Sequence, residues 1–188
     1  SVSHRTYRRE PSFTVAIARD PAFNFMYEAN IRYLHHLGEV TYFSPLADTS
    51  LPDAGFVYLP GGYPELYLAA LSANRPMLQS IRRYVENGGK LLAECGGMMY
   101  LCDEIRDKNG DVFPMVGVLH QSATMENMKL RLGYRTLLYN DARLKGHEFH
   151  YSRLVEQQDP LPSCAVAYTA KGVKTDTPLY RYKNVLAG

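Results

Sequence analysis

A single cysteine on a glycine-rich corner is the feature that most constrains this chain. The run 90–100 (KLLAECGGMMY) begins as a short apolar strand, places Cys95 on the corner and continues with helical residues. This order is typical of a nucleophile elbow, which exposes a reactive side chain above the end of a parallel sheet. Gly96 and Gly97 leave room in a turn that a Cβ would crowd, and the helix dipole favours a thiolate. The run predicts covalent thiol chemistry at Cys95.

The hydrophobic pattern around this corner predicts strands that alternate with helices. Alternation of this kind indicates an α/β fold, an open and mostly parallel sheet with helices on both faces, whose ligand sites lie at the carboxyl ends of the strands. Past residue 107 the pattern becomes strand-like. Predicted strands are 13–18, 40–43, 55–59, 113–119, 128–139, 147–154 and 165–170, and predicted helices are 23–37, 65–71 and 75–87.

Composition excludes several classes of protein. A net charge of +2, with no long basic run, gives no electrostatic reason to expect nucleic acid. No apolar stretch approaches the roughly 18 residues that span a bilayer, and three cysteines without CxxC spacing favour neither disulfides nor a metal site. A reducing cytoplasm is therefore the expected location. We expect residues 1–12 to be a linker from an upstream domain, and residues 13–188 to be one domain truncated at its C-terminus.

A second glycine corner follows the predicted strand 55–59. Pro60-Gly61-Gly62 lies between that strand and a helix, so its backbone can approach a ligand closely. The N–H groups of Gly62 and Gly96 together would form an oxyanion hole. A tight turn without function is the alternative for this corner taken alone.

The remaining polar candidates lie beside these corners and in the run 146–152 (GHEFHYS). On a strand, Glu148, His150 and Ser152 share one face, where a histidine can serve as base for a thiol. The alternative is a strand whose histidines only form hydrogen bonds. Glu65 is a candidate site-lining residue and a candidate first-turn carboxylate, and Glu94 a local hydrogen-bonding residue.

Three segments together resemble one known family. LPGGYPELYLAAL (59–71), GGKLLAECGGMMYL (88–101) and the pair LGYR (132–135) and GHEFHYS (146–152) are similar to the C-terminal class I (triad) glutamine amidotransferase domain of cobyrinic acid a,c-diamide synthase. The resemblance covers nearly the whole chain and implies a flavodoxin-like sheet. It also implies that Cys95 attacks the side-chain amide of glutamine, that Gly62 and Gly96 hold the oxyanion, and that water then hydrolyses the thioester.

The same resemblance implies a partner domain for the released ammonia. An N-terminal ATP-dependent synthetase domain of the same parent chain would use ATP and Mg to amidate the a and c carboxylates of cobyrinic acid in cobalamin biosynthesis. No GxxxxGK[ST] loop occurs here, so no cofactor is expected in this domain. Family members end in a segment resembling V-L-A-S-Y-x-H-x-H, whose first histidine is the base. This chain stops at Val185-Leu186-Ala187-Gly188, so we expect a poised cysteine and little or no glutaminase turnover.

Three other readings remain open at this point. A nickel-sirohydrochlorin a,c-diamide synthase would share the same glutaminase part. An elbow-cysteine peptidase or deglycase would usually place a histidine where this chain has Gly96. A non-catalytic module would keep the fold and lack the chemistry. His150 is not the family's base, although it is a candidate for lining the site.

Overall fold

The computed structural model describes residues 13–126 and 180–188, together with the backbone of strands between residues 131 and 175. Its centre is a six-stranded sheet with the order β13-β14-β4-β3-β1-β2. All neighbouring pairs are parallel except β13 and β14, which form an antiparallel hairpin. The strands are β1 (Thr14–Ala18), β2 (Glu39–Phe43), β3 (Phe56–Leu59), β4 (Leu91–Ala93), β13 (Tyr180–Tyr182) and β14 (Val185–Ala187).

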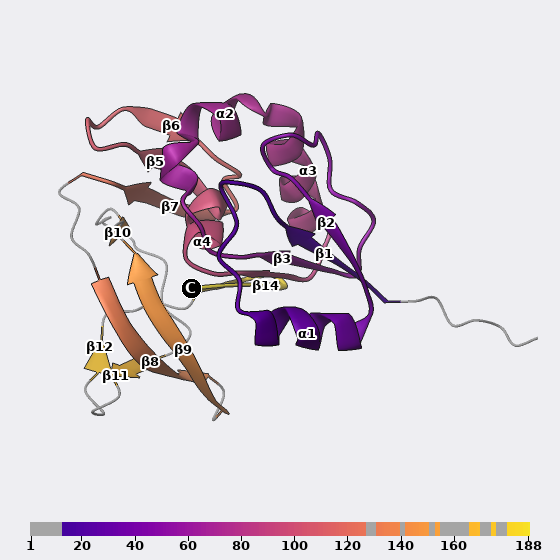
Figure 1. Ribbon diagram of the computed structural model, residues 1–188. Helices are drawn as coiled ribbons and strands as arrows, with labels where there is room; N and C mark the ends of the chain where they lie inside the picture. Colours follow the sequence, from indigo (N-terminus) through magenta and orange to yellow (C-terminus); the bar gives the residue numbers. More distant parts are fainter. Residues whose placement is uncertain are drawn as a thin grey trace, which may run out of the picture.

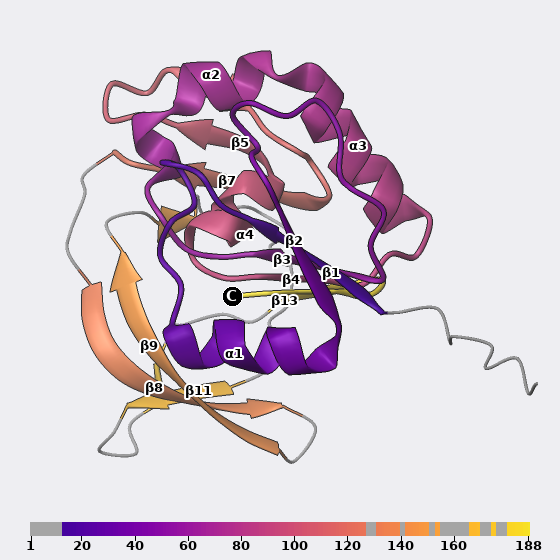
Figure 2. The same cartoon turned by 45° about the vertical axis from the view of Figure 1, so that its right-hand side comes forward.

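Helices cover both faces of this sheet (Figures 1 and 2). They are α1 (Glu28–Leu37), the 3-10 helix η1 (Pro64–Leu66), α2 (Leu68–Ala73), α3 (Arg75–Glu86) and α4 (Gly96–Leu101). On one face, Leu34 of α1 packs in a buried cluster with Val15, Ile17 and Tyr58. The larger cluster lies on the other face and includes the buried side of α3. The order β2-β1-β3-β4-β14 is that of flavodoxin-like sheets, so the predicted fold class is confirmed.

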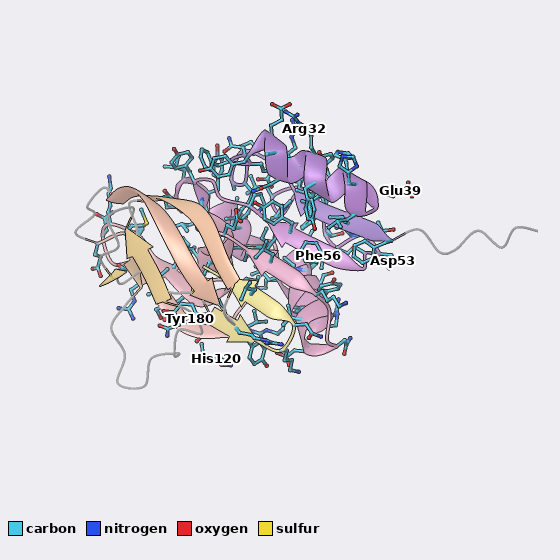
Figure 3. The ribbon with its side chains drawn as sticks, turned by 90° about the horizontal axis from the view of Figure 1, so that it is seen from below. Arg32, Glu39, Asp53, Phe56, His120 and Tyr180 are labelled. Atoms are coloured by element: carbon cyan, nitrogen blue, oxygen red, sulfur yellow. The ribbon has the colours of Figure 1, made fainter. Side chains whose placement is uncertain are left out.

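Two smaller sheets carry the later strands. One has the order β10-β7-β5-β6 and the other the order β12-β11-β8-β9. Seen from below, Arg32 of α1 and His120 of β7 lie at opposite edges of the molecule (Figure 3). No helix in the described part of the chain is long and apolar enough to cross a membrane. The strands of the two smaller sheets are β5 (Cys102–Arg106), β6 (Val112–Pro114), β7 (Leu119–Thr124), β8 (Arg131–Tyr139), β9 (Ala142–His150), β10 (Arg153–Leu154), β11 (Val166–Thr169) and β12 (Lys174–Thr175).

The first helix begins later than the sequence pattern predicts. The predicted start at residue 23 is wrong, because α1 begins at Glu28. The Asp20 carboxylate accepts the N–H groups of Ala22 and Phe23, which makes a turn there, and Phe25 then pairs with Gly61. Side-chain hydrogen bonding by an aspartate commonly competes with helix formation in this way. Phe23 and Phe25 therefore belong to a loop at the carboxyl end of β1, while the later apolar residues of the predicted helix lie in α1.

Two further predicted elements differ from the structure. The helix 65–71 divides into η1 and α2 at Tyr67, and the strand 113–119 is interrupted. Between β6 and β7, residues 115–118 donate their N–H groups to carbonyls of the segment 100–103. Gly117 has φ 74° there, a conformation that favours glycine. These backbone contacts replace the ladder that a continuous strand would need.

Candidate active site

Cys95 has the strained backbone of a nucleophile elbow. It lies between β4 and α4 with φ 47° and ψ −112°, and its side chain is half-buried. A non-glycine residue with positive φ is uncommon, and such strain is concentrated at functional sites. The strand, the sharp turn and the helix that the run 90–100 predicts are therefore confirmed. The thiol chemistry of Cys95 stays a prediction.

The two glycines after Cys95 are needed because α4 approaches the β3 side of the sheet closely. A Cβ on Gly97 would collide with the backbone oxygen of Leu59, and one on Gly96 would lie 2.8 Å from Cδ of Pro64. The predicted crowding at this corner thus has a definite source. The strain itself is at Cys95, while the glycines allow the helix start to pack against the loop that follows β3.

That loop is the predicted second corner, and it lies directly beside Cys95. A Cβ built on Gly61 would be 3.6 Å from the Cβ of Cys95, and one built on Gly96 would be 3.3 Å from the oxygen of Gly62. Among the described residues, no backbone hydrogen bond uses the N–H of Gly62 or of Gly96. The two corners therefore meet, with two amide donors available at the meeting point. Their service as an oxyanion hole is a proposal taken up below.

The segment after β1 holds this second corner in place. Ala22 accepts the N–H of Tyr63, Phe25 donates its N–H to Gly61, and a Cβ on Gly62 would collide with the backbone of Ala22. Sequence reasoning missed Asp20, whose carboxylate shapes this segment. The available signal was a lone aspartate two residues past a buried strand, a position where loops of parallel sheets carry functional groups.

Asp20 also ties a second loop to the first. Its Oδ1 accepts the N–H groups of Ala22 and Phe23, at 2.8 and 3.1 Å. Its Oδ2 accepts the Ser44 hydroxyl at 2.8 Å and the Leu46 N–H at 3.0 Å. One carboxylate thus joins the loops that follow β1 and β2, and through them supports the glycine corner after β3.

Glu94 forms a hydrogen bond, as predicted, but its partner is on another strand rather than local in sequence. Its Oε2 accepts the hydroxyl of Tyr58 at 2.7 Å, and its N–H donates to the Leu59 carbonyl. Tyr58 is 2% exposed, and burial together with the Glu94 charge raises its pKa, so its hydroxyl stays protonated. Tyr58 is the second residue that sequence reasoning did not single out. Its apolar surroundings on β3 make it look like an ordinary core residue.

Glu65 lies on η1, whose Pro64 contacts the start of α4. It is half-buried, and burial raises the pKa of its carboxyl group. Its place in the first turn of η1 agrees with the first-turn interpretation, while its contact with a ligand stays a prediction. Glu148 and His150 lie on β9, where only the backbone is described, so their side chains fall outside the described residues.

The other cysteines divide into one core residue and one undescribed residue. Cys102 is a fully buried core residue, and burial raises the pKa of its thiol to about 12. It is the first residue of β5, directly after α4. Cys164 lies outside the described residues. Within the described part of the chain, no group of three His, Cys, Asp or Glu side chains could hold a metal ion.

The last residue of the chain also reaches the elbow. Gly188 donates its N–H to Ala93 and accepts the N–H of Cys95 at 2.9 Å. The strand β14 runs parallel to β4, with Ala187 opposite Ala93. The carboxyl ends of β1, β3, β4 and β14 therefore converge on Cys95, at the edge where open α/β sheets bind their ligands.

Comparison with known proteins shows the family of this chain. The family of CobB/CobQ-like glutamine amidotransferase domains matches residues 14–188. The hydrogenobyrinate a,c-diamide synthase of Pseudomonas aeruginosa is 42% identical over 160 residues, covering 85% of this chain and 35% of the relative. The cobyrinate a,c-diamide synthase of Clostridium acetobutylicum is 39% identical over 189 residues, covering 95% of this chain and 42% of the relative. The chain therefore spans little more than a third of the length of these relatives.

Solved structures agree at the level of the fold. PurLQS from Thermotoga maritima superimposes with a TM-score of 0.62 at 18% identity, over 94% of this chain and 85% of that one. A glutamine amidotransferase crystal structure superimposes with a TM-score of 0.63 at 18% identity, over 93% of this chain and 87% of that one. With the family match over almost its whole length and relatives near 40% identity, the chain belongs to the CobB/CobQ-like glutamine amidotransferase family.

Proposed function

We propose that this domain hydrolyses glutamine through a thioester on Cys95 and supplies ammonia for amidation of the a and c carboxylates of a corrinoid. The observation that carries the proposal is the strained backbone of Cys95, in contact with the glycine corner after β3, in a chain of the glutamine amidotransferase family. Relatives named for cobyrinate and for hydrogenobyrinate support a corrinoid as the final acceptor.

The chemistry proceeds in two steps at the carboxyl edge of the sheet. The Cys95 thiolate attacks the side-chain amide carbon of glutamine, and the oxygen gains negative charge that the N–H groups of Gly62 and Gly96 stabilise. Collapse of this intermediate breaks the C–N bond, and the amine leaves as ammonia after gaining a proton. Water then attacks the γ-glutamyl thioester, which releases glutamate and restores the thiol.

The proton transfers need a general base, and the family resemblance places it on a histidine following the strand that corresponds to β14. The backbone of Gly188 is hydrogen-bonded to Cys95 N–H, so a residue following β14 is well placed to reach the thiol. We propose a base of this kind rather than His150. ATP and Mg are assigned to a separate synthetase domain, which fits the share of the relatives that this chain covers.

Covalent labelling with 6-diazo-5-oxonorleucine tests the proposal. This glutamine analogue should add one label, localised by peptide mass spectrometry to Cys95, in a chain extended past Gly188 with the matching segment of the Clostridium acetobutylicum relative. Cys95→Ser should abolish the label, while Cys102→Ser, which alters a buried core thiol, should retain it. The unextended chain should label weakly and release little glutamate.

Absence of labelling in the extended protein would contradict the glutaminase assignment and favour a binding module. Labelling that glutamine cannot suppress would favour a generic reactive thiol, as in the peptidase alternative. A nickel-sirohydrochlorin acceptor in place of a corrinoid would leave all of these results unchanged, so the acceptor is tested separately, by ammonia-dependent amidation with the complete parent protein.

A further inference from the structure

A buried tyrosine beside the elbow has no part in the chemistry proposed above. Tyr58 lies on β3, one residue before the end of the strand, and it is 2% exposed. Its hydroxyl donates to Oε2 of Glu94 at 2.7 Å. Glu94 directly precedes Cys95, and its backbone N–H donates to Leu59. Both the side chain and the backbone of Glu94 are therefore tied to β3 immediately before the strained residue.

A glutamate at this position works against a reactive thiol. A carboxylate within several ångströms of a thiol raises the thiol's pKa, because like charges repel. A half-buried carboxylate also needs hydrogen-bond donors to replace lost water. Tyr58 supplies such a donor from a neighbouring strand, and bonds to charged acceptors are stronger than bonds between neutral groups.

The hydrogen-bonded pair of Tyr58 and Glu94 lies beside an apolar cluster and close to Cys95. Tyr58 packs with Val15, Ile17 and Leu34, so the described cluster on the α1 face of the sheet is otherwise apolar. The charges of Glu94 and Cys95 both act to raise the pKa of the Tyr58 hydroxyl, and the Asn30 side chain on α1 acts to lower it. The sulfur of Cys95 is thus electrostatically coupled to the same hydroxyl that holds Glu94.

Another ionisable group near the elbow comes from η1. Glu65 lies on η1, which packs against α4. On β9, His147, Glu148 and His150 have side chains outside the described residues. The direct hydrogen bond from the Tyr58 hydroxyl to Glu94 is therefore the contact to test first.

We propose that Tyr58 is a positioning residue for Cys95: its hydroxyl fixes the Glu94 carboxylate on the α1 face of the sheet, offsets part of its charge, and ties the strained elbow to β3. The proposal rests on Cys95 being the nucleophile. It assigns the buried hydroxyl a role beyond packing, because a phenylalanine would fill the same apolar cluster without restraining the carboxylate.

Two substitutions should move the reactivity of Cys95 in opposite directions. In Tyr58→Phe the carboxylate loses its donor and is released, so the apparent pKa of Cys95 should rise by about half to one unit. In Glu94→Gln the negative charge beside the sulfur is removed, so the apparent pKa should fall by about one unit. At a pH below the thiol pKa, these shifts correspond to about three- to tenfold slower and about tenfold faster thiolate-dependent alkylation, respectively.

The experiment measures alkylation of Cys95 by iodoacetamide from pH 5 to pH 10, with the site quantified by peptide mass spectrometry. Wild type, Tyr58→Phe and Glu94→Gln are compared with Tyr84→Phe. The Tyr84 hydroxyl also donates a hydrogen bond, to the Lys90 carbonyl at 2.9 Å. Lys90 directly precedes β4, so this bond lies at the opposite end of that strand from Cys95. The control variant should leave the pH profile of Cys95 unchanged.

Opposite shifts in the two variants would support the positioning role. Equal profiles for wild type and Tyr58→Phe, or shifts of one sign in both variants, would overturn it and leave Tyr58 as a core residue. Circular dichroism establishes that each variant is folded. If Tyr58→Phe does not fold, Glu94→Gln decides, since an unchanged profile there would also overturn the proposal.

This result is independent of the labelling test for the glutaminase. Iodoacetamide reports the thiol alone, whereas 6-diazo-5-oxonorleucine requires a glutamine pocket. A wild-type protein that takes no glutamine analogue would contradict the proposed function, whatever the alkylation profiles show. Normal analogue labelling with no change in Tyr58→Phe would contradict only the inference about Tyr58.

Discussion

Two non-glycine residues in the described part of the chain have positive φ, and they differ in what maintains them. Cys95 has φ 47° at the elbow, and Lys183 has φ 50° in the exposed turn between β13 and β14. At the turn, Lys183 Nζ bonds to Glu86 of α3, and Asn184 bonds to Gly88. At the elbow, the support is close packing of glycines against β3 and its loop. The turn is held by hydrogen bonds from its own side chains, whereas the elbow is held by close packing of backbone atoms in the interior.

The comparison indicates where substitutions are tolerated. The hairpin turn is bonded through exposed side chains that solvent can replace, and exposed ion pairs stabilise proteins little. The elbow depends on backbone approach distances that have no such substitute. The residue that would do chemistry therefore has a conformation that depends on close packing of the backbone around it.

The largest expected effect comes from crowding the two regions with one methyl group each. Gly97→Ala should destabilise the protein by about 3 kcal/mol, because the new Cβ meets the backbone oxygen of Leu59. In Gly88→Ala, beneath the hairpin, the new Cβ would make only an ordinary contact with Asn184 Nδ2 at 3.6 Å, but φ is 83°, so the substitution should cost about 1 kcal/mol. Urea unfolding of both variants measures the difference. Equal losses would contradict the distinction between the regions.

A second experiment isolates backbone strain. The stability difference between glycine and alanine at one position reports the cost of positive φ in a residue with a Cβ. The ψ of −112° takes Cys95 outside the left-handed basin. The free energy of unfolding of Cys95→Gly should therefore exceed that of Cys95→Ala by about 2 kcal/mol. The same pair at Lys183 should differ by about 1 kcal/mol. Chemical denaturation provides all four values, and a larger difference at Lys183 would reverse the comparison.

Two carboxylates should respond to pH in opposite directions, and Glu65 near the elbow is the first. Burial raises the pKa of Glu65 in the folded state. The protonated carboxyl group therefore favours the folded state. Its contribution to the free energy of unfolding is complete below the unfolded pKa and is lost as the pH rises through the raised folded pKa. Glu65→Gln should thus be slightly more stable than wild type at pH 7, with the difference vanishing near pH 4. Melting temperatures across this range test the sign.

Glu86 beneath the hairpin should show the reverse and the smallest effect. Hydrogen bonds from Lys183 and Tyr182 lower the pKa of Glu86 in the folded state. Its stabilising contribution is present above the unfolded pKa and is lost as the pH falls through the lowered folded pKa. Glu86→Gln should be slightly less stable at pH 7, less so in high salt because the group is exposed. A loss that persists at pH 2 would contradict an electrostatic origin.

The sequence predicted the sheet and the elbow well because each has a local signal. Short apolar runs marked β1, β3 and β4, and the pattern of residues 75–87 marked α3, which ends at Glu86. The cysteine and two glycines marked the corner itself. A short strand followed by two glycines leaves the backbone few alternatives, so local reasoning was sufficient there.

The contacts around the elbow were not predictable in the same way. The hydrogen bond between Tyr58 and Glu94 joins residues 36 positions apart, and the Asp20 contacts to Ser44 and Leu46 join separate loops. Such pairs depend on strand order and register, which periodicity does not give. The late start of α1 has the same cause, because an aspartate and a remote glycine compete with the helical pattern. Gly38 follows α1 with an extended backbone, and a glycine is required there because a Cβ would collide with the backbone of Phe13.

The shared carboxylate of Asp20 has a consequence for how this domain tolerates changes in length. The loops after β1 and β2 are joined at Ser44 and Leu46, so neither can gain a residue there without displacing the other. An insertion beside Asp53, which is exposed near the amino end of β3 (Figure 3), should instead be accommodated. Tags, linkers and domain insertions can therefore be placed at Asp53, at the edge of the sheet remote from Cys95.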